Sequence, residues 1–335
     1  MSEISVVHPS DLGPREIAAW RAMCAATLPY GNPFLSFEFA SAVGSARRDA
    51  RVAVVEDSSG VVAFFPFQRR PLGIGKPIGH LINDCQGVIH TPEYSWDPKA
   101  LVKACDLSVW TFDNLLQVQQ PFKPWFSTVD RSPHIDVSRG FDHVVASAGG
   151  AGSGRGIYRE AQRKRAKLSK LVGPVRVERS PGLSEAFNGL VRWKSAQYAR
   201  TGQWDRFGTR WVREVVEHLL CSEDPIHATV SALYAGDAMI AAHLTLASPR
   251  IIVFWFPAYD PAYAKYSPGI ILQTDNIDHA TTGDWKLIEL GKGQTEYKDR
   301  LSTGASEVAV GAVTTRSLRR LAWQTQSRLR RTLHS

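Results

Sequence analysis

The segment IIVFWFPAYDPAYAKYSPGIILQ, residues 251–273, joins a continuous apolar run to a polar stretch and then to a helix-like stretch. The run Ile251–Ala258 predicts a buried β-strand, because strands covered on both faces are apolar throughout. Ser267 is a candidate helix N-cap, Pro268 suits a first helical turn, and Gly269 allows close approach of a ligand. The helix N-terminus predicted here favours a phosphate or an oxyanion. A capped helix with tyrosines at a domain seam is the simpler alternative.

Both halves of the chain show the same order of strands, tight turns and a helix before the last strands. This pattern predicts a duplicated α/β (α+β) unit, each copy a mixed and mostly antiparallel sheet flanked by helices. The first half contains predicted strands at 51–57, 61–68, 78–89 and 112–118 and a helix at 98–109. The second half contains predicted strands at 228–235, 239–248, 251–259, 286–290 and 307–313 and a helix at 268–280.

The glycine-rich stretch GGAGSGRG, residues 149–156, separates the two halves. A phosphate-binding loop is the sharper interpretation, but the stretch fits neither GxGxxG nor GxxxxGK[ST]. We therefore interpret it as a linker between an N-terminal domain, residues 1–148, and a C-terminal domain, residues 157–335.

The composition indicates a globular protein with a preference for anionic partners. Of the 335 residues 44% are apolar and 21% are charged, and the net charge is +8. The excess of basic residues lies in 155–170 and 316–331. The four cysteines are scattered, so neither a metal site nor a disulfide framework is predicted. With no apparent signal sequence or membrane span, the expected location is cytoplasmic; the oligomeric state is not predicted.

His243 is the first candidate for acid–base chemistry. It lies in the predicted strand 239–248, on the more polar face together with Thr245. A neutral imidazole can take a proton from an amine or hydroxyl near neutral pH, although a hydrogen-bonded core histidine is the alternative. Asp260 is the second candidate base, and Tyr259 is a candidate donor of a proton to the leaving group.

A second group of candidates follows the predicted strand 286–290. Gly291 and Gly293 permit a sharp bend, after which come Tyr297, a second candidate proton donor, and Lys298. Lys298 is suited to stabilise a phosphate or an acyl carbonyl, and a solvated lysine is the alternative.

Two further stretches are candidates for substrate binding. The basic run 155–170, with Arg163 within it, predicts a helix that binds nucleic acid, the diphosphate of a nucleotide-linked substrate or coenzyme A. Solvated surface charge is the alternative. Lys194 and Gln197 share one face of a predicted helix with Tyr198 and are candidates to line an acceptor site.

The motifs together resemble a known family. The strings YDPAYAKYSPGIIL (259–272) and IELGKGQTEYK (288–298) are similar to GNAT-related acyltransferases grouped with the cellulose-biosynthesis CelD/BcsL proteins, which are related to FemAB-type transferases. NDCQGVI (83–89) and the basic helix resemble further segments of that family. Cys85 departs from the pattern, because an aromatic residue is expected there.

The resemblance implies tandem GNAT-like domains that transfer an acyl group from acyl-CoA, as co-substrate, to an amine or hydroxyl of a small or saccharide acceptor. It suggests polysaccharide or cell-envelope synthesis. Direct attack on the thioester is expected because no activated serine or cysteine nucleophile is visible. The alternatives are an aminoacyl-tRNA-dependent transferase of the FemAB type and a non-catalytic accessory protein that binds polyanions.

Overall fold

One mixed β-sheet runs through the whole molecule in this computed structural model, which describes residues 2–149, 154–180, 185–293 and 295–315. Neighbouring strands follow the order β1-β2-β3-β4-β6-β13-β7-β12-β11-β10-β9-β8, and β5 pairs with β3 outside this path. The strand pairs are antiparallel except β4 with β6 and β11 with β12. This confirms the predicted α/β class, with a large and mostly antiparallel sheet flanked by helices.

The strands are β1 (Glu3–Val7), β2 (Ala50–Asp57), β3 (Gly60–Arg70), β4 (Ile74–Pro77), β5 (Ile89–His90), β6 (Val109–Leu116), β7 (Phe126–Asp136), β8 (Val175–Ser180), β9 (His227–Ala235), β10 (Ala238–Ala247), β11 (Ile251–Tyr259), β12 (Leu287–Glu289) and β13 (Gly304–Thr314). The α-helices are α1 (Pro14–Ala26), α2 (Phe37–Ala46), α3 (Pro98–Ala104), α4 (Phe141–Ser147), α5 (Arg155–Leu171), α6 (Glu185–Thr201), α7 (Arg210–Leu220), α8 (Pro268–Ala280) and α9 (Glu296–Leu301). The short 3-10 helices are η1 (Pro9–Asp11), η2 (Pro29–Gly31), η3 (Pro33–Leu35), η4 (Pro71–Gly73), η5 (Gln120–Trp125) and η6 (Pro261–Tyr266).

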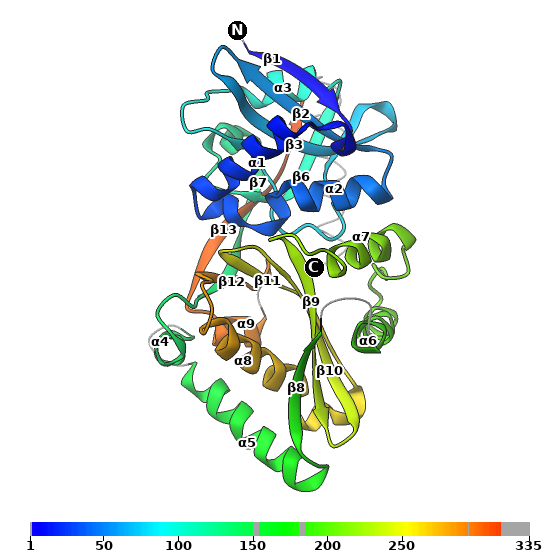
Figure 1. The fold of residues 1–335 in the computed structure, drawn as a ribbon, viewed down its shortest axis with the longest axis vertical. Coiled ribbons are helices and arrows are strands. Elements are labelled where there is room, and N and C mark those ends of the chain that lie inside the picture. Colours follow the sequence, from blue (N-terminus) through cyan, green and yellow to red (C-terminus); the bar gives the residue numbers. More distant parts are fainter. Residues whose placement is uncertain (1, 150–153, 181–184, 294, 316–335) are drawn as a thin grey trace.

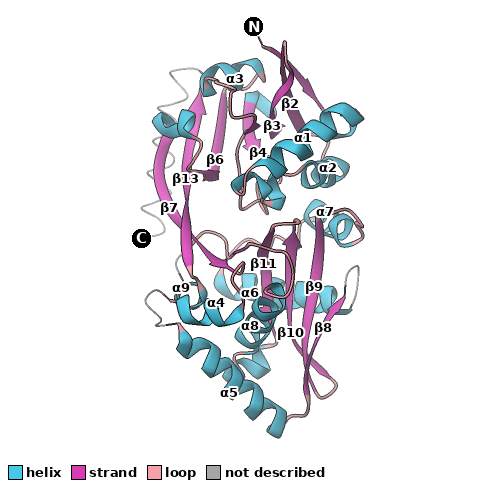
Figure 2. Ribbon diagram, turned by 60° about the vertical axis from the view of Figure 1, so that its left-hand side comes forward, coloured by secondary structure: helices cyan, strands magenta, loops and turns pink. Residues whose placement is uncertain are grey.

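The two halves of the chain share strands instead of forming separate sheets (Figure 1). β13 comes from the end of the described chain, yet it lies between β6 and β7 of the first half. The last residues of β7 in turn pair with β12 of the second half. Figure 2 shows β7 and β13 running side by side from one half of the molecule to the other. The sequence pattern had assigned residues 307–313 to the sheet of the second half, but alternation of side chains does not say which strand is the neighbour.

Only part of the expected linker, residues 149–156, can be compared with the structure, because residues 150–153 lie outside the described residues, as does the basic segment 316–331. Gly149 N–H donates to the carbonyl oxygen of Ser302 at 2.9 Å, and Gly154 N–H donates to that of Ala148 at 2.8 Å. Both ends of the stretch are thus fixed to neighbouring backbone.

An apolar seam joins the two halves. Trp255 of β11 contacts Phe34 edge to face with ring centroids 5.4 Å apart, and Phe39 with centroids 6.4 Å apart. All three side chains are buried in one continuous hydrophobic cluster that takes residues from both halves. Extensive apolar burial of this kind favours a fixed orientation of the halves.

The predicted strand at 78–89 is wrong over most of its length, because residues 78–88 form an irregular buried loop. Backbone groups of this loop are hydrogen-bonded to side chains instead of to a neighbouring strand. The Asn83 amide donates to the carbonyl oxygen of Ile78 and accepts from Cys85 N–H. Gln86 Oε1 accepts from two backbone N–H groups of β6. Buried loops need such substitutes, because unpaired backbone groups are costly.

Candidate active site

β11 and β12 separate after a short parallel contact. They pair only where Ile251–Val253 lie opposite Leu287–Glu289. β11 then continues to Tyr259 with β10 as its neighbour on the other side. Beyond Val253, no described strand pairs with β11 on its β12 side, so the backbone N–H and C=O groups along this side can bind an extended ligand.

The helix start predicted at Pro268 lies directly after this open edge. Ser267 precedes it in the left-handed conformation, with φ 50° and ψ 52°, and its side chain does not cap α8 as expected. The Ser267 hydroxyl instead accepts a hydrogen bond of 2.6 Å from Lys164 Nζ of α5. A Cβ at Gly269 would lie 3.5 Å from the Tyr259 ring, an ordinary contact, so space alone does not require glycine there.

A loop from the first half reaches β11 beside its open edge. The Trp255 indole donates to the carbonyl oxygen of Ile82 at 2.8 Å, and Arg206 Nε donates to that of Leu81 at 3.1 Å. These two bonds hold the loop 78–88 between β11 and the segment that links α6 to α7. They place Asp84, which follows in this loop, at the junction of the two halves.

Asp84 and Lys298 converge beside Gly291. A Cβ at Gly291 would lie 3.4 Å from Asp84 Oδ2 and 4.0 Å from Lys298 Nζ, and its φ of 74° suits glycine. Lys298 Nζ also donates to the carbonyl oxygens of Gly291 and Lys292, each at 3.0 Å. The lysine therefore fixes the turn after β12 and faces a carboxyl group from the other half.

The surroundings raise the pKa of two carboxyl groups, those of Asp84 and of Glu289. Burial raises the pKa of Asp84 to about 6, although the nearby Lys298 charge partly opposes the rise. Burial alone raises the pKa of Glu289, at the end of β12, to about 8. The charges of both carboxyl groups raise the pKa of the Cys85 thiol in addition to its burial. Neither carboxyl group has a hydrogen bond or ion pair with a described residue.

Two further cations, Lys194 and Arg206, belong to this region of the molecule. We refer to Asp84, Glu289, Lys298, Lys194 and Arg206 as the cluster. Burial lowers the pKa of Lys298, and burial together with Arg206 and Lys298 lowers the pKa of Lys194 to about 8. Lys194 Nζ lies 5.6 Å from the centre of the Tyr198 ring, and the Arg206 guanidinium lies 5.4 Å from it. Lys194 of α6 and Arg206 of the segment that follows α6 therefore give this side of the site positive charge.

His243 lies elsewhere, fully buried between β10 and α8. Its Nδ1 is 3.2 Å from the Asn276 amide, and its ring contacts Phe254 with centroids 4.5 Å apart. Burial, followed by the charge of Lys194, lowers the pKa of His243 to about 3, so the ring is neutral. Nε2 has no hydrogen-bond partner among the described residues. The face of β10 that carries His243 is covered by α8, so the geometry favours the alternative of a core histidine over a base.

The remaining candidates are divided between the cluster and other positions. Asp260 accepts from Ala262 N–H at 2.9 Å and caps η6, so its carboxylate serves that turn. Burial raises the pKa of Tyr297, one residue before Lys298. Gly293 has a φ of 110° in the same turn as Gly291. Gln197 accepts from Lys194 Nζ at 3.1 Å, whereas Arg163 is exposed on the outer face of α5.

Three residues of this cluster were missed in the sequence: Asp84, Glu289 and Arg206. Asp84 lies in the string NDCQG, where the pattern predicted a strand, and Glu289 alternates with apolar residues in a short strand. A carboxylate inside an apolar run was the one available signal for Glu289.

In the part of the chain that the structure describes, no three histidine, cysteine or acidic residues are placed to hold a metal ion. None of the described helices is long and apolar enough to cross a membrane.

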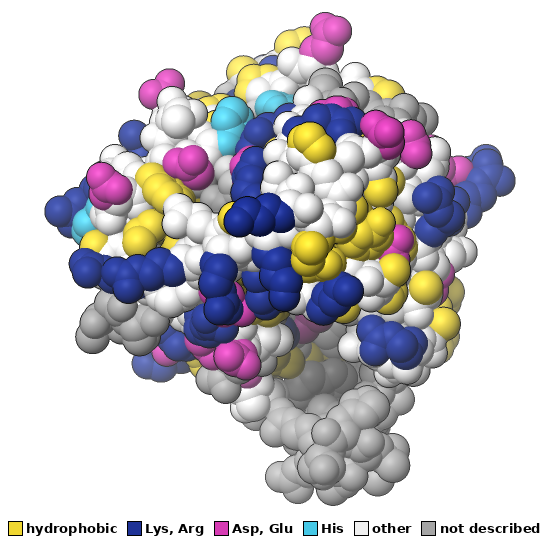
Figure 3. Space-filling model, turned by 90° about the horizontal axis from the view of Figure 1, so that it is seen from below, with side chains coloured by type: hydrophobic (Ala, Val, Ile, Leu, Met, Phe, Trp, Pro, Cys, Tyr) yellow, Lys and Arg dark blue, Asp and Glu magenta, His cyan; other side chains and the backbone are white. Residues whose placement is uncertain are grey.

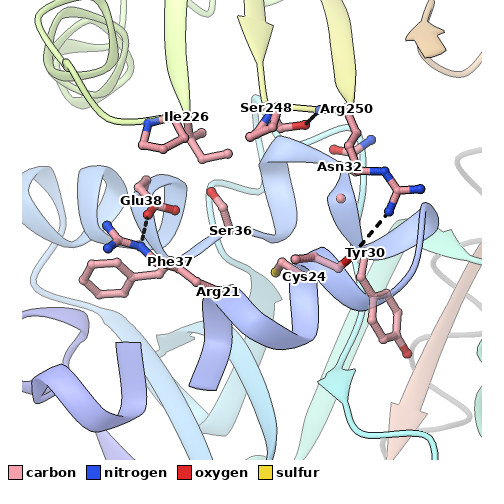
Figure 4. Close-up of a pocket in the computed structure, with 14 residues that line it drawn as sticks. Arg21, Cys24, Tyr30, Asn32, Ser36, Phe37, Glu38, Ile226, Ser248 and Arg250 are labelled. Atoms are coloured by element: carbon pink, nitrogen blue, oxygen red, sulfur yellow. Dashed lines mark hydrogen bonds and ion pairs between the residues drawn. The ribbon is translucent and has the colours of Figure 1, made fainter. Parts of the chain in front are cut away.

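A separate cavity of about 220 Å³ lies at the seam between α1, α2 and the β10–β11 turn (Figure 4). Arg21 pairs with Glu38 at 2.6 Å on one side of it, and Arg250 Nη1 donates to the carbonyl oxygen of Ala25 at 3.3 Å on the other. Burial, followed by the Glu38 charge, raises the pKa of the Cys24 thiol in its wall to about 12. The ion pair and the protonated thiol leave no activated base or nucleophile there.

Comparisons with known proteins concern the fold of the chain. Residues 155–299 match a family model described as an acetyltransferase (GNAT) domain, and this range contains β11, α8, Glu289 and Lys298. No curated protein matches the chain. The chain is similar to the structure of FemX with a TM-score of 0.60 and 10% identity, over 95% of this chain and 99% of that one.

Two other solved structures share the fold over nearly the whole chain. A tandem GNAT protein from the clavulanic acid biosynthesis pathway has a TM-score of 0.53 and 9% identity, over 94% of this chain and 99% of that one. A conserved protein of unknown function from Bacteroides thetaiotaomicron has a TM-score of 0.56 and 8% identity, over 94% of this chain and 100% of that one. At such identities the likeness shows the fold alone. Residues 155–299 are thus similar to a GNAT acetyltransferase domain, and the fold of the chain is similar to those of a tandem GNAT protein and FemX.

Proposed function

We propose that the protein is an acyltransferase that moves an acyl group from an acyl-CoA thioester to an amine or hydroxyl acceptor. The observation that carries the proposal is the approach of Asp84, from the first half, to Lys298, from the second, beside Gly291 in the turn that follows Glu289 and the end of β12. GNAT domains use acyl-CoA as donor, and the match covers the open edge of β11. An extended pantetheine arm along β11, with its phosphates toward the start of α8, would bring the thioester to the cluster.

The two carboxyl groups suit opposite roles in direct transfer. At pH 7 a carboxyl with a pKa of about 6 is mostly ionised, so Asp84 takes the proton that the attacking amine or hydroxyl loses. Glu289, with a pKa of about 8, is mostly protonated and gives its proton to the leaving thiolate. The new C–N or C–O bond forms as the C–S bond breaks, and proton exchange with water restores both carboxyl groups. Lys298 stabilises the negative charge that develops on the carbonyl oxygen.

These assignments move the roles of base and acid away from His243, Asp260, Tyr259 and Tyr297. His243 is enclosed and neutral, and Asp260 caps a turn. Lys298 keeps the role expected from the sequence. Lys194 and Arg206 fit an acceptor that carries negative charge, such as a saccharide or cell-envelope precursor with a phosphate or carboxylate. This setting also agrees with the resemblance to the CelD/BcsL proteins.

The proposal predicts that acyl-CoA raises the melting temperature of the purified protein, because a ligand that binds the folded state alone stabilises it. A ligand at a hundred times its Kd adds about 2.7 kcal/mol, equivalent to several degrees. The measurement is thermal unfolding with acetyl-CoA, longer acyl-CoAs, free CoA and a short RNA in parallel. Stabilisation by RNA with none by any CoA compound would contradict the proposed donor.

The pair of pKa values also predicts the pH dependence of the reaction. Asp84 must be ionised, so kcat/KM should fall about tenfold for each pH unit below about 6. Glu289 must be protonated, so kcat/KM should also fall above about 8. The measurement is release of CoA thiol from acetyl-CoA with an accepted amine across pH 5 to 9. Because Lys194 also titrates near 8, the Glu289→Gln variant decides the assignment: it should be slow and lack the alkaline decline.

A second candidate function follows from the likeness to FemX over 95% of the chain. In an aminoacyl-tRNA-dependent transferase of the FemAB type, the same carboxyl groups and Lys298 would act on an aminoacyl ester. The RNA arm of the thermal experiment separates this candidate from the first when charged and uncharged tRNA are included.

A further inference from the structure

A row of exposed cations lies along the outer face of α5. Its members are separated by four, four, four and three residues, which keeps them on one side of a helix over about 22 Å. None of them has a hydrogen bond or ion pair with a described residue, and the acidic residue that borders the row, Glu160, pairs instead with Lys164 at 2.8 Å and with Arg300 at 3.1 Å. The row consists of Arg155, Arg159, Arg163, Lys167 and Lys170.

The opposite face of α5 is fixed to the protein, so the row points into solvent. Leu168 is fully buried, and Lys164 contacts both Glu160, at 2.8 Å, and Ser267. Arg165 pairs with Asp275 of α8 at 2.8 Å. The inner face of α5 therefore holds the helix in place, and the cations of the row make no contact that stabilises the fold.

An apolar tip extends the row at the C-terminal end of α5. Leu171 is 63% exposed and Val172 is 38% exposed, and both rank among the few large apolar side chains that the described surface leaves open. Arg176, at the start of β8, is also exposed, but its Nε pairs with Glu178 at 2.9 Å and its Nη1 donates to the carbonyl oxygen of Gly236 at 2.7 Å. Figure 3 shows this end of the molecule, where the side chains of lysine and arginine gather, with apolar and acidic ones scattered among them.

We propose that this face of α5 docks on an anionic lipid bilayer. The row of cations binds headgroup phosphates, while Leu171 and Val172 enter the boundary between headgroups and acyl chains. The charge of the surface is complementary to such a bilayer, and the aliphatic tip favours lipid over nucleic acid. Recognition of single-stranded RNA commonly uses aromatic side chains, but the outer row has none, and Tyr158 is buried on the inner face. The inference is independent of the proposed acyl transfer.

The experiment measures binding of the full chain to vesicles. Phosphatidylcholine vesicles are compared with vesicles that contain phosphatidylcholine and phosphatidylglycerol in a three-to-one ratio, by flotation at low and physiological salt. We expect binding to the anionic vesicles alone. The triple variant Arg159→Glu, Lys167→Glu, Lys170→Glu should weaken it about 100-fold or more, since each basic residue near the surface contributes about fivefold.

Two further variants make the result specific. Lys99→Glu, Lys103→Glu, Lys123→Glu changes the net charge by the same amount, at exposed lysines of the first half, and should retain most of the binding. Leu171→Ser with Val172→Ser should weaken binding without a change of charge. The proposal is overturned if anionic vesicles do not bind, if the control triple variant loses as much binding as the α5 variant, or if a short duplex RNA binds through α5 while vesicles do not.

Discussion

Replacing Asp84 by Asn is expected to reduce kcat for acyl transfer by about 10²- to 10⁴-fold, the range that removal of a general base produces. The amide keeps the volume of the side chain but cannot take a proton from the acceptor. The measurement is the release of CoA thiol with saturating acetyl-CoA and an accepted amine. Binding of acetyl-CoA, followed by thermal unfolding, should be retained because the role proposed for Asp84 is to take a proton from the acceptor, not to hold the donor.

The same variant should be at least as stable as the natural protein. A carboxyl group whose pKa is higher in the folded than in the unfolded state is ionised at neutral pH at a cost to the fold, which grows as the pH rises from 3.8 to about 6 and is constant above that. Asn removes that charge, so the melting temperature at pH 8 should be unchanged or higher. A fall in activity that accompanied a large fall in melting temperature would indicate misfolding.

Asp113→Asn is the matched control. Asp113 is close enough to raise the pKa of Asp84, but its carboxylate accepts a hydrogen bond of 2.6 Å from Gln86. If Asp84 is the base, Asp113→Asn should change the rate by only a few-fold. Equal losses in the two variants would show that negative charge in the region matters, and that no single carboxylate acts as base.

The contrast between α8 and Asp84 shows which parts of such a site a sequence can reveal. The helix was predicted at 268–280 and is observed at those residues, because Pro268 and the apolar spacing are local signals. Asp84 owes its raised pKa to burial by a loop that Trp255 and Arg206 hold from the other half. No pattern within NDCQG encodes those contacts. His243 illustrates the converse, because the polar face on which it was predicted is covered by α8.

The sequence pattern also could not predict that β13, from the second half of the chain, lies between two strands of the first half. Its alternating and apolar residues predicted a strand, but pairing with β6 and β7 depends on how the two halves lie against each other. The register shifts at Gly311 against both neighbours. Because β13 is hydrogen-bonded to β6 on one side and to β7 on the other, a substitution that displaces the backbone at Gly311 should destabilise the whole sheet.

Replacing Gly311 by Ala is therefore expected to destabilise the protein by about 3 kcal/mol, the upper range for overpacking a close contact. A Cβ at this position would lie within 3 Å of the Trp125 carbonyl oxygen and 2.6 Å from the Phe112 ring, so backbone must move. Gly156→Ala is the matched control, because a Cβ there meets no atom within 4 Å and alanine favours a helix. Urea unfolding should show one transition shifted to lower urea for Gly311→Ala and none shifted downward for Gly156→Ala. Two separate transitions, with only one of them shifted, would mean that the halves fold independently in spite of the shared strand.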